Sequence, residues 1–199
     1  MSTSMPTTRL EAFSDGVFAV IITIMVIELK VPQSGEFAAL LDLAPLLLSY
    51  LLSFVYIAIF WNNHHHLLLA VQQVSGGVLW SNMYLLFWVS LIPFTTAWMG
   101  ESNFAKAPMA VYGFVLLMAA IGYHMLQHLL IRLHGPSSPL AIAVGGDRKG
   151  LFSLLLYAVG IALSWWEPLA AAACYVAVTI LWLIPDRRIA KAIESSPTE

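Results

Sequence analysis

Long apolar runs alternate with short polar breaks along the whole 199-residue chain. A run of about 20 residues is long enough to cross the hydrocarbon core of a bilayer as an α-helix. The last two runs are shorter and are divided only by Glu167, but Pro168 can begin a new helix, because proline is tolerated at the first helical position. The pattern therefore predicts an all-α, polytopic membrane protein with six transmembrane helices, over about residues 9–30, 37–60, 74–98, 107–131, 150–166 and 168–185.

The composition agrees with a membrane-embedded bundle. Hydrophobic residues make up 60% of the chain and charged residues only 10%, whereas about 25% of the residues of a soluble domain are charged. Six spans use about 120 residues, so we expect a single transmembrane domain over 1–199 without a separate catalytic domain. The formal net charge of -2 provides no field that would attract nucleic acid, and the single cysteine, Cys174, excludes an intrachain disulfide.

The basic residues predict the orientation in the membrane. Cytoplasmic loops carry an excess of Lys and Arg, and six spans place seven of the nine basic residues on one side. We therefore expect a multi-pass protein of the cell (inner or plasma) membrane with both termini in the cytoplasm. The expected cytoplasmic residues are Arg9, Arg132, Arg148, Lys149, Arg187, Arg188 and Lys191, and the expected outer residues are Lys30 and Lys106.

The first predicted span is unusual because it carries charged residues. A carboxylate inside a span is costly, and it marks a functional group or a group with a specific partner. Asp15 lies about one turn inside the cytoplasmic end. It could support the N-terminus of the helix, or it could take part directly in transport. Glu28 and Lys30, at the outer end, are interpreted as interfacial residues.

The same span presents an aliphatic stripe. At about 100° per residue, Ile24 and Ile27 lie within about 40° of Val20, and Thr23 lies beside them. Asp15 lies about 140° away from Val20, on another side of the helix. The stripe could face a pore, with Asp15 towards neighbouring helices, or it could face lipid, with Asp15 towards a cavity. The spacing leaves both arrangements open.

The residues of this span resemble those of a known family. The string Arg9-Leu10-Glu11-Ala12-Phe13-Ser14-Asp15 resembles the Arg-x-x-x-Phe-Ser-Asp signature of the transmembrane protein 175 family. That family comprises endosomal and lysosomal potassium channels and their single-repeat prokaryotic relatives. The resemblance covers essentially the whole chain, through Trp61-Asn62-Asn63-His64-His65, Leu91-Ile92-Pro93-Phe94-Thr95 and the closely spaced last pair of spans.

The resemblance implies a homotetrameric, potassium-permeable cation channel in which the first helix of each subunit lines a central pore. The narrowest point in the family is an aliphatic ring five residues after the signature aspartate, which corresponds to Val20. Further pore-facing positions correspond to Thr23 or Ile24 and to Ile27. Relatives often carry Ile or Leu at the narrowest position, so the smaller Val20 implies a wider constriction and modest potassium selectivity. The implied partners are other copies of the chain, membrane lipids and permeant K+ ions, without a further cofactor.

Polar residues around the signature are expected to hold the first helix in place. Hydrogen bonds and charge pairs would join the signature residues to polar residues of neighbouring helices. The expected network comprises Arg9, Phe13, Ser14 and Asp15 with Asn62, His64 and His65.

The histidines do not predict a metal site. Consecutive residues on a helix point about 100° apart, so His64, His65 and His66 cannot converge on one ion. His124 and His128 share a helix face at a spacing that suits a metal better, but packing or interfacial hydration is the favoured interpretation.

Other classes of function can be weighed on the same residues. The predicted spans contain no paired aspartates, no Ser with a His or Lys arranged for catalysis and no His-Glu-x-x-His zinc helix, so an enzyme is not expected. The main alternative to a channel is a proton-coupled secondary transporter that uses Asp15 and the histidines as a relay. A membrane scaffold is the remaining alternative.

Overall fold

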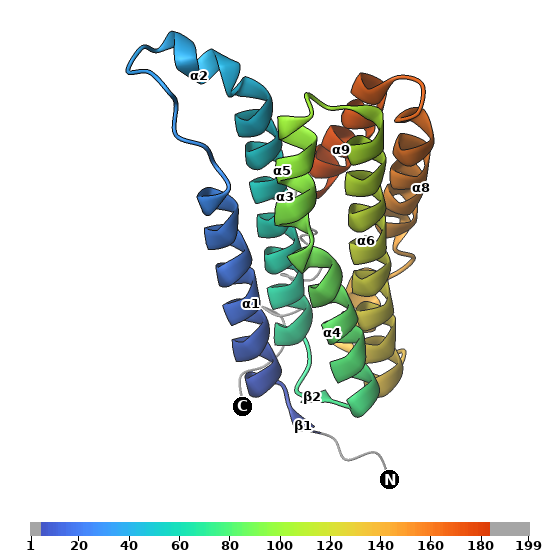
Figure 1. Ribbon diagram of the computed structural model, residues 1–199. Helices are drawn as coiled ribbons and strands as arrows, with labels where there is room; N and C mark the ends of the chain where they lie inside the picture. Colours follow the sequence, from blue (N-terminus) through green and yellow to red (C-terminus); the bar gives the residue numbers. More distant parts are fainter. Residues whose placement is uncertain (1–4, 184–199) are drawn as a thin grey trace.

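The computed structural model describes residues 5–183, which form a bundle of helices (Figure 1). Two very short strands, β1 (Met5–Pro6) and β2 (Gln73–Val74), accompany the helices. The described helices are α1 (Thr8–Ile27), α2 (Ala38–Asp42), α3 (Ala44–Leu69), α4 (Gly76–Ser90), α5 (Ile92–Glu101), α6 (Lys106–His134), α7 (Pro139–Val144), α8 (Arg148–Leu163) and α9 (Pro168–Leu183).

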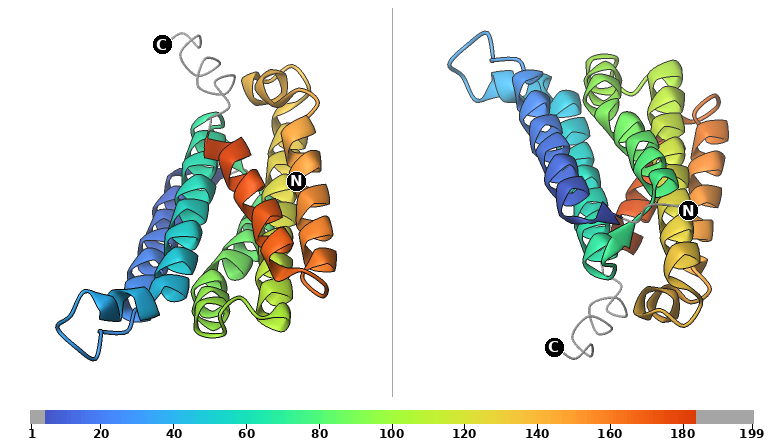
Figure 2. Two further views of the ribbon diagram at one scale, coloured as in Figure 1. Left: turned by 90° about the horizontal axis from the view of Figure 1, so that it is seen from above. Right: turned by 90° about the horizontal axis from the view of Figure 1, so that it is seen from below.

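The long helices run alternately in opposite directions along the bundle (Figure 1). α1, α4, α5 and α8 run one way, and α3, α6 and α9 run the other way. Figure 2 shows from both ends that α1 lies beside α3 at one edge of the bundle and that α8 lies at the other edge. Because α1 packs only on one side, against α3, α4 and α5, a large part of its surface is uncovered within one chain.

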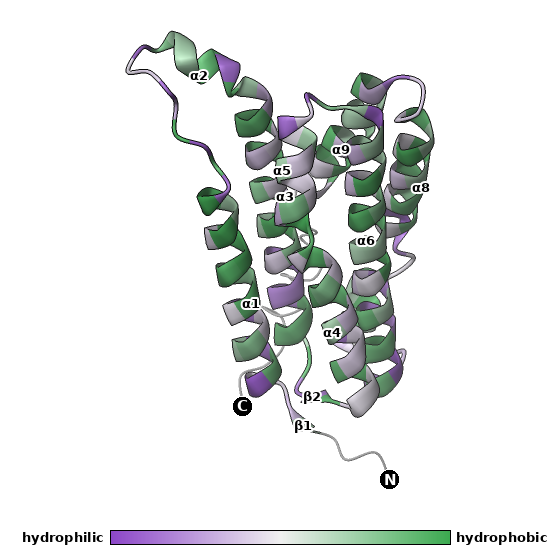
Figure 3. Cartoon of the chain, in the orientation of Figure 1, coloured by the Kyte–Doolittle hydropathy of each residue, from purple (hydrophilic) through white to green (hydrophobic). Residues whose placement is uncertain are grey.

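Among the described residues, four helical segments are long and apolar enough to cross a membrane. α8 and α9 have 16 residues each, which corresponds to a rise of about 24 Å. Figure 3 shows that α1 is hydrophobic along most of its length and hydrophilic at the end next to β1. The four segments are Thr8–Ile27, Ala44–Leu69, Gly76–Glu101 and Lys106–His134.

The second predicted span, 37–60, differs from the helix found there. α3 begins at Ala44 and continues to Leu69, so the polar residues 61–66 lie inside the helix and not after it. Residues 38–42 form the separate helix α2. Backbone hydrogen bonds close a helix regardless of side-chain polarity. The hydropathy pattern therefore misplaced both ends of this helix, because it follows the polarity of the side chains and not the hydrogen bonds of the backbone.

The third predicted span, 74–98, is divided into α4 and α5 at Leu91. Pro93 lies in the first turn of α5. Because proline has no backbone N–H and its ring clashes with the preceding turn, a helix breaks or kinks there. The two helices still follow one path along the bundle (Figure 1).

The segment before α1 is held by the short strand pair. Met5 pairs with Val74 and Pro6 with Gln73 in antiparallel register. This pair ties the start of α1 to the connection between α3 and α4. Two-residue strands leave no alternating pattern, so the sequence did not predict them.

The basic residues lie near helix ends. Arg9 is in the first turn of α1, Arg132 is in the last turn of α6, and Arg148 begins α8, all towards the end of the bundle that carries β1 (Figure 1). Lys30 follows α1 and Lys106 begins α6, at the opposite end. The positions of Arg187, Arg188 and Lys191, and the end of the last predicted span, lie outside the described residues.

Two glycines allow Tyr175 of α9 to pack between α6 and α8. A Cβ atom at Gly113 would overlap the hydroxyl of Tyr175, and a Cβ at Gly160 would overlap its ring. Tyr175 is fully buried, and its hydroxyl donates a hydrogen bond to the carbonyl of Met109 at 3.2 Å. The small residues therefore position α9 against both neighbouring helices.

Replacing Gly113 with alanine should destabilise the bundle by about 1–3 kcal/mol, because overpacking forces Tyr175 out of its place. The midpoint of thermal unfolding of the purified protein in detergent measures this loss. Gly77→Ala is the matched control, since the nearest atom to its new Cβ lies 3.9 Å away. Equal midpoints for the two variants would contradict the packing described for Tyr175.

Candidate functional site

One face of α1 is buried against the bundle, and its residues recur every three or four positions. This spacing places them on one side of a helix. The face holds α1 on α3 and α4 and so fixes which side of α1 remains uncovered. Its residues are Leu10, Ser14, Phe18, Ile21 and Met25.

The uncovered face of α1 carries the predicted aliphatic stripe. Val20 is 55% exposed, Ile24 is 42% exposed and Ile27 is 79% exposed. Phe13 and Thr23 are also exposed. The hydroxyl of Thr23 donates a hydrogen bond to the carbonyl of Val20 at 2.8 Å. Because this hydroxyl is bound to its own helix, the stripe presents a mostly apolar surface.

Ser14, on the buried face, belongs to a hydrogen-bonded chain across three helices. Nδ2 of Asn82 on α4 donates to Oγ of Ser14 at 3.0 Å. Oδ1 of the same Asn82 lies 2.7 Å from Nε2 of His64 on α3, so Nε2 donates and carries the proton. All three side chains are buried, and the ring of Phe18 packs on His64. The chain thus links α1, α3 and α4.

Asp15, the next residue, makes a different contact. Nε1 of Trp61 on α3 donates to Oδ1 of Asp15 at 2.9 Å. The ring of His65 stacks on Trp61, with centroids 5.5 Å apart and an interplanar angle of 16°. Asp15 is exposed and Ser14 is buried, as expected for neighbours about 100° apart on a helix. Ser14 therefore connects α1 to α3 through Asn82 of α4, whereas Asp15 connects α1 to α3 directly through Trp61.

The remaining residues of the expected network lie elsewhere. Arg9 is exposed, and it forms no hydrogen bond or ion pair with any residue that the structure describes. Asn62 contributes its backbone carbonyl, which lies 2.7 Å from Nδ1 of His66. The ring of Phe13 is exposed on the stripe side of α1. The three histidines of the run make three different contacts, and the described residues contain no group of three or more metal-ligating side chains.

Sequence reasoning missed Asn82, the residue that joins Ser14 to His64. Asn82 lies within the third predicted span and is fully buried. A polar side chain inside an apolar span needs a partner, and that signal could have drawn attention to it. Trp61 was part of the segment that carries the family resemblance, but its role as the hydrogen-bond donor to Asp15 was not predicted.

The C-terminal end of α1 has a contact of its own. Lys30, just after α1, forms an ion pair with Glu101 at the end of α5, with Nζ 2.8 Å from Oε1. Both side chains are exposed, so the pair contributes little stability.

These features define an α-helical membrane protein whose first helix lies at the edge of the bundle with an apolar face uncovered. A family model described as "Endosomal/lysosomal potassium channel TMEM175" matches residues 9–93. A protein of a Chryseobacterium species that is named a potassium channel is 48% identical over 188 residues, which cover 94% of this chain and 98% of that protein. The chain therefore belongs to the TMEM175 family.

Relatives from Chamaesiphon minutus extend this similarity to the fold. A protein named a potassium channel is 34% identical over 190 residues, covering 85% of this chain and 90% of that protein. A crystal structure described as "a lysosomal potassium-selective channel TMEM175 homolog" matches with a TM-score of 0.79 at 32% identity, covering 90% of this chain and 97% of that chain. The similarity spans both the signature helix and the second half of the bundle.

Proposed function

We propose that this protein is a potassium-permeable cation channel, and not an enzyme, in which α1 lines the pore. The observation that carries the proposal is the uncovered aliphatic stripe of α1, which is exposed while another face of the helix packs on the bundle. The names of the bacterial relatives, potassium channel, support the same function.

We further propose that α1, α3, the α4–α5 pair, α6, α8 and α9 are the six membrane spans. Their alternating directions would bring both termini to the same side. Arg9, Arg132 and Arg148 at that side, against Lys30 and Lys106 at the other, favour a cytoplasmic location for it. The protein would then be a multi-pass protein of the cell membrane.

The proposed assembly is a homotetramer. Four copies around a common axis would bring four α1 helices together, each with its stripe towards the axis. The position of α1 at the edge of one copy (Figure 2) is compatible with this arrangement, because none of the other described helices covers the stripe. The surrounding helices would face lipid.

The proposed constriction consists of Val20, with Thr23, Ile24 and Ile27 extending the neck. A narrow ring of aliphatic side chains can lose its water, and a cation cannot cross a dry neck, so this ring acts as a gate. Since no backbone carbonyls replace the hydration shell of the ion, potassium selectivity should be modest. Ser14 and Asp15 would act as positioning residues that hold α1 through Asn82 and Trp61.

The contacts of Asp15 do not favour the proton-coupled transporter. Among the described residues, Asp15 is hydrogen-bonded to Trp61 and not to a histidine. His64 is connected to Ser14, and not to Asp15, through Asn82. A relay that passes protons from Asp15 to His64 would need a continuous hydrogen-bonded path. Among the described residues, no hydrogen bond joins the Asp15–Trp61 pair to the Ser14–Asn82–His64 chain.

Ion flux into liposomes that contain the purified protein tests the proposed function. We expect rapid passive flux of potassium, a smaller flux of sodium and no requirement for a proton gradient. Empty liposomes are the control for leakage. A slow, saturating flux that depends on a proton gradient would contradict a channel and would support the transporter.

A further inference from the structure

A cavity lies in the second half of the bundle, away from α1. It opens between α3, α6, α8 and α9 and has a volume of about 50 Å³. The proposed pore does not use this cavity, and neither signature residue lines it.

Five of the residues that line the cavity are aromatic. Tyr56 and Tyr157 lie with ring centroids 6.3 Å apart on one side, and Tyr123 and Trp182 meet edge to face at 6.4 Å on another. Phe60 completes this lining. The faces of aromatic rings carry negative electrostatic potential and attract cations. Several rings around one small cavity therefore favour a positively charged occupant.

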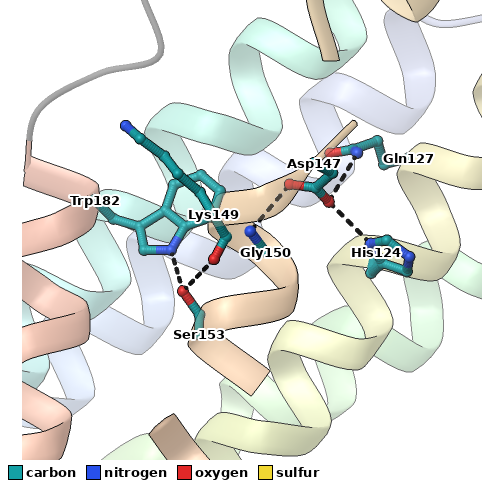
Figure 4. Close-up of polar contacts among 7 residues, drawn as sticks. All are labelled: His124, Gln127, Asp147, Lys149, Gly150, Ser153 and Trp182. Carbon is teal, nitrogen blue, oxygen red and sulfur yellow. Dashed lines mark hydrogen bonds and ion pairs between the residues drawn. The ribbon is translucent and has the colours of Figure 1, made fainter. Parts of the chain in front are cut away.

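One carboxylate completes the lining. Asp147 has a left-handed backbone conformation, with φ of +31°, and caps α8 by accepting a hydrogen bond from the N–H of Gly150 at 3.0 Å. Figure 4 shows its other carboxylate oxygen directed at His124 and Gln127 of α6, with Oδ2 3.0 Å from Nδ1 of His124 and 3.3 Å from Nε2 of Gln127. These three contacts fix a negative charge beside the aromatic walls.

One ammonium group of the chain itself lies near Trp182, one of the aromatic residues that line the cavity. Nζ of Lys149 lies 6.0 Å from the centroid of the Trp182 ring (Figure 4), which is within the range of a cation–π contact. The indole N–H of Trp182 donates to Oγ of Ser153 at 2.8 Å, which fixes the orientation of the ring. The Trp182 face is thus a fixed surface that accepts an alkylammonium group.

We propose that this cavity binds a small organic ammonium ion, with the cationic head among Tyr56, Tyr157 and Trp182 and near the carboxylate of Asp147. Rings together with a carboxylate are the chemistry that recognises quaternary and other alkylated ammonium groups. Either a free ammonium compound or the choline headgroup of a lipid supplies this chemistry. The site does not depend on the proposed pore, so its test requires no flux measurement.

Binding is measured by titrating choline into the full-length protein in nanodiscs made of phosphatidylglycerol, with saturation-transfer NMR or calorimetry as the readout. The neutral isostere 3,3-dimethyl-1-butanol, which has the shape of choline without its charge, is the matched ligand. Choline should bind at least about tenfold more tightly, because about 1.4 kcal/mol of cation attraction corresponds to that factor. Equal binding of the two ligands, or no binding of choline at millimolar concentration, would overturn the proposal.

Variants locate the site. Asp147→Asn keeps an acceptor for Gly150, since asparagine is also a good helix cap, and it should weaken choline binding about tenfold through loss of charge. Trp182→Leu should weaken binding to a similar extent. Trp165→Leu, an exposed tryptophan that does not line the cavity, should leave binding unchanged. Unchanged binding in both cavity variants would overturn the assignment.

Lys149→Gln provides an independent check, because it removes the ammonium group that already contacts Trp182. This variant should bind choline more tightly than the unaltered chain, and weaker binding would contradict a cation site. A second set of nanodiscs made of phosphatidylcholine distinguishes the two sources. Weaker binding of free choline there identifies the lipid headgroup as an occupant, and unchanged binding identifies free ammonium compounds.

Discussion

Substituting Val20 with alanine should raise potassium flux about tenfold, which corresponds to a barrier lower by about 1.4 kcal/mol. Alanine removes two methyl groups from each copy at the narrowest part of the proposed neck. A wider and less apolar ring holds water more readily, and a hydrated cation then crosses at lower cost. Passive flux into liposomes at matched amounts of reconstituted tetramer measures the change.

Val26→Ala is the matched control for this prediction. Val26 is on the same helix, is the same residue type and is 50% exposed, close to the 55% of Val20. The two residues lie about 120° apart around the helix, so Val26 would face away from the proposed pore. Equal increases in the two variants would show that any truncation of exposed α1 residues loosens the protein, and the constriction would be wrongly assigned.

Replacing Asn82 with alanine should destabilise the protein by about 2 kcal/mol and abolish most of the potassium flux. The substitution removes two hydrogen bonds and leaves His64 and Ser14 buried without their partner. Hydrogen bonds between membrane helices contribute about 1 kcal/mol each, and an unsatisfied buried polar group adds to the cost. Since Asn82 connects α1 to α3 and α4, the position of the pore-lining helix should be lost before the rest of the bundle unfolds.

Thermal unfolding in detergent and liposome flux test the Asn82 variant together. Ser90→Ala is the control on the same helix, because Ser90 is exposed and its hydroxyl donates, among the described residues, to the carbonyl of Phe87. A second variant separates polarity from packing. Combining Asn82→Leu with His64→Phe and Ser14→Ala makes the three positions apolar and should recover part of the stability lost in Asn82→Ala. A single Asn82→Ala variant with unaltered unfolding and flux would contradict the positioning role.

The predicted spans 107–131 and 150–166 overlap α6 and α8, and the last predicted span begins with α9 at Pro168, whereas α7 was not predicted. Helical spacing placed Val20, Ile24 and Ile27 on one side and Asp15 on another, and α1 is helical over all four residues, which are all exposed. Periodicity succeeds here because it depends on helix geometry within one element. It could not fix the ends of α3, because hydropathy reports the surroundings of a residue and not the hydrogen bonds of its backbone.

Contacts between elements were harder to predict. Ser14 and His64 were expected to interact, but the pair is bridged by Asn82, which is 68 residues from Ser14 along the chain. Asp147 lies between the fourth and fifth predicted spans, where nothing in the local pattern indicates that its carboxylate reaches His124 on α6. Such contacts depend on how helices align, and alignment is decided by packing, as at Gly113 and Tyr175, and not by the pattern of any one helix.

The central claim is that the Val20 face of α1 lines the ion pathway, and cysteine accessibility tests it most directly. Cys174 is the only cysteine of the chain, so Cys174→Ala gives a background without thiols. In this background, a charged, water-soluble thiol reagent is applied to Val20→Cys and to Val26→Cys channels in liposomes. We predict that the reagent blocks potassium flux through Val20→Cys and leaves flux through Val26→Cys unchanged. Block of Val26→Cys without block of Val20→Cys would contradict the account.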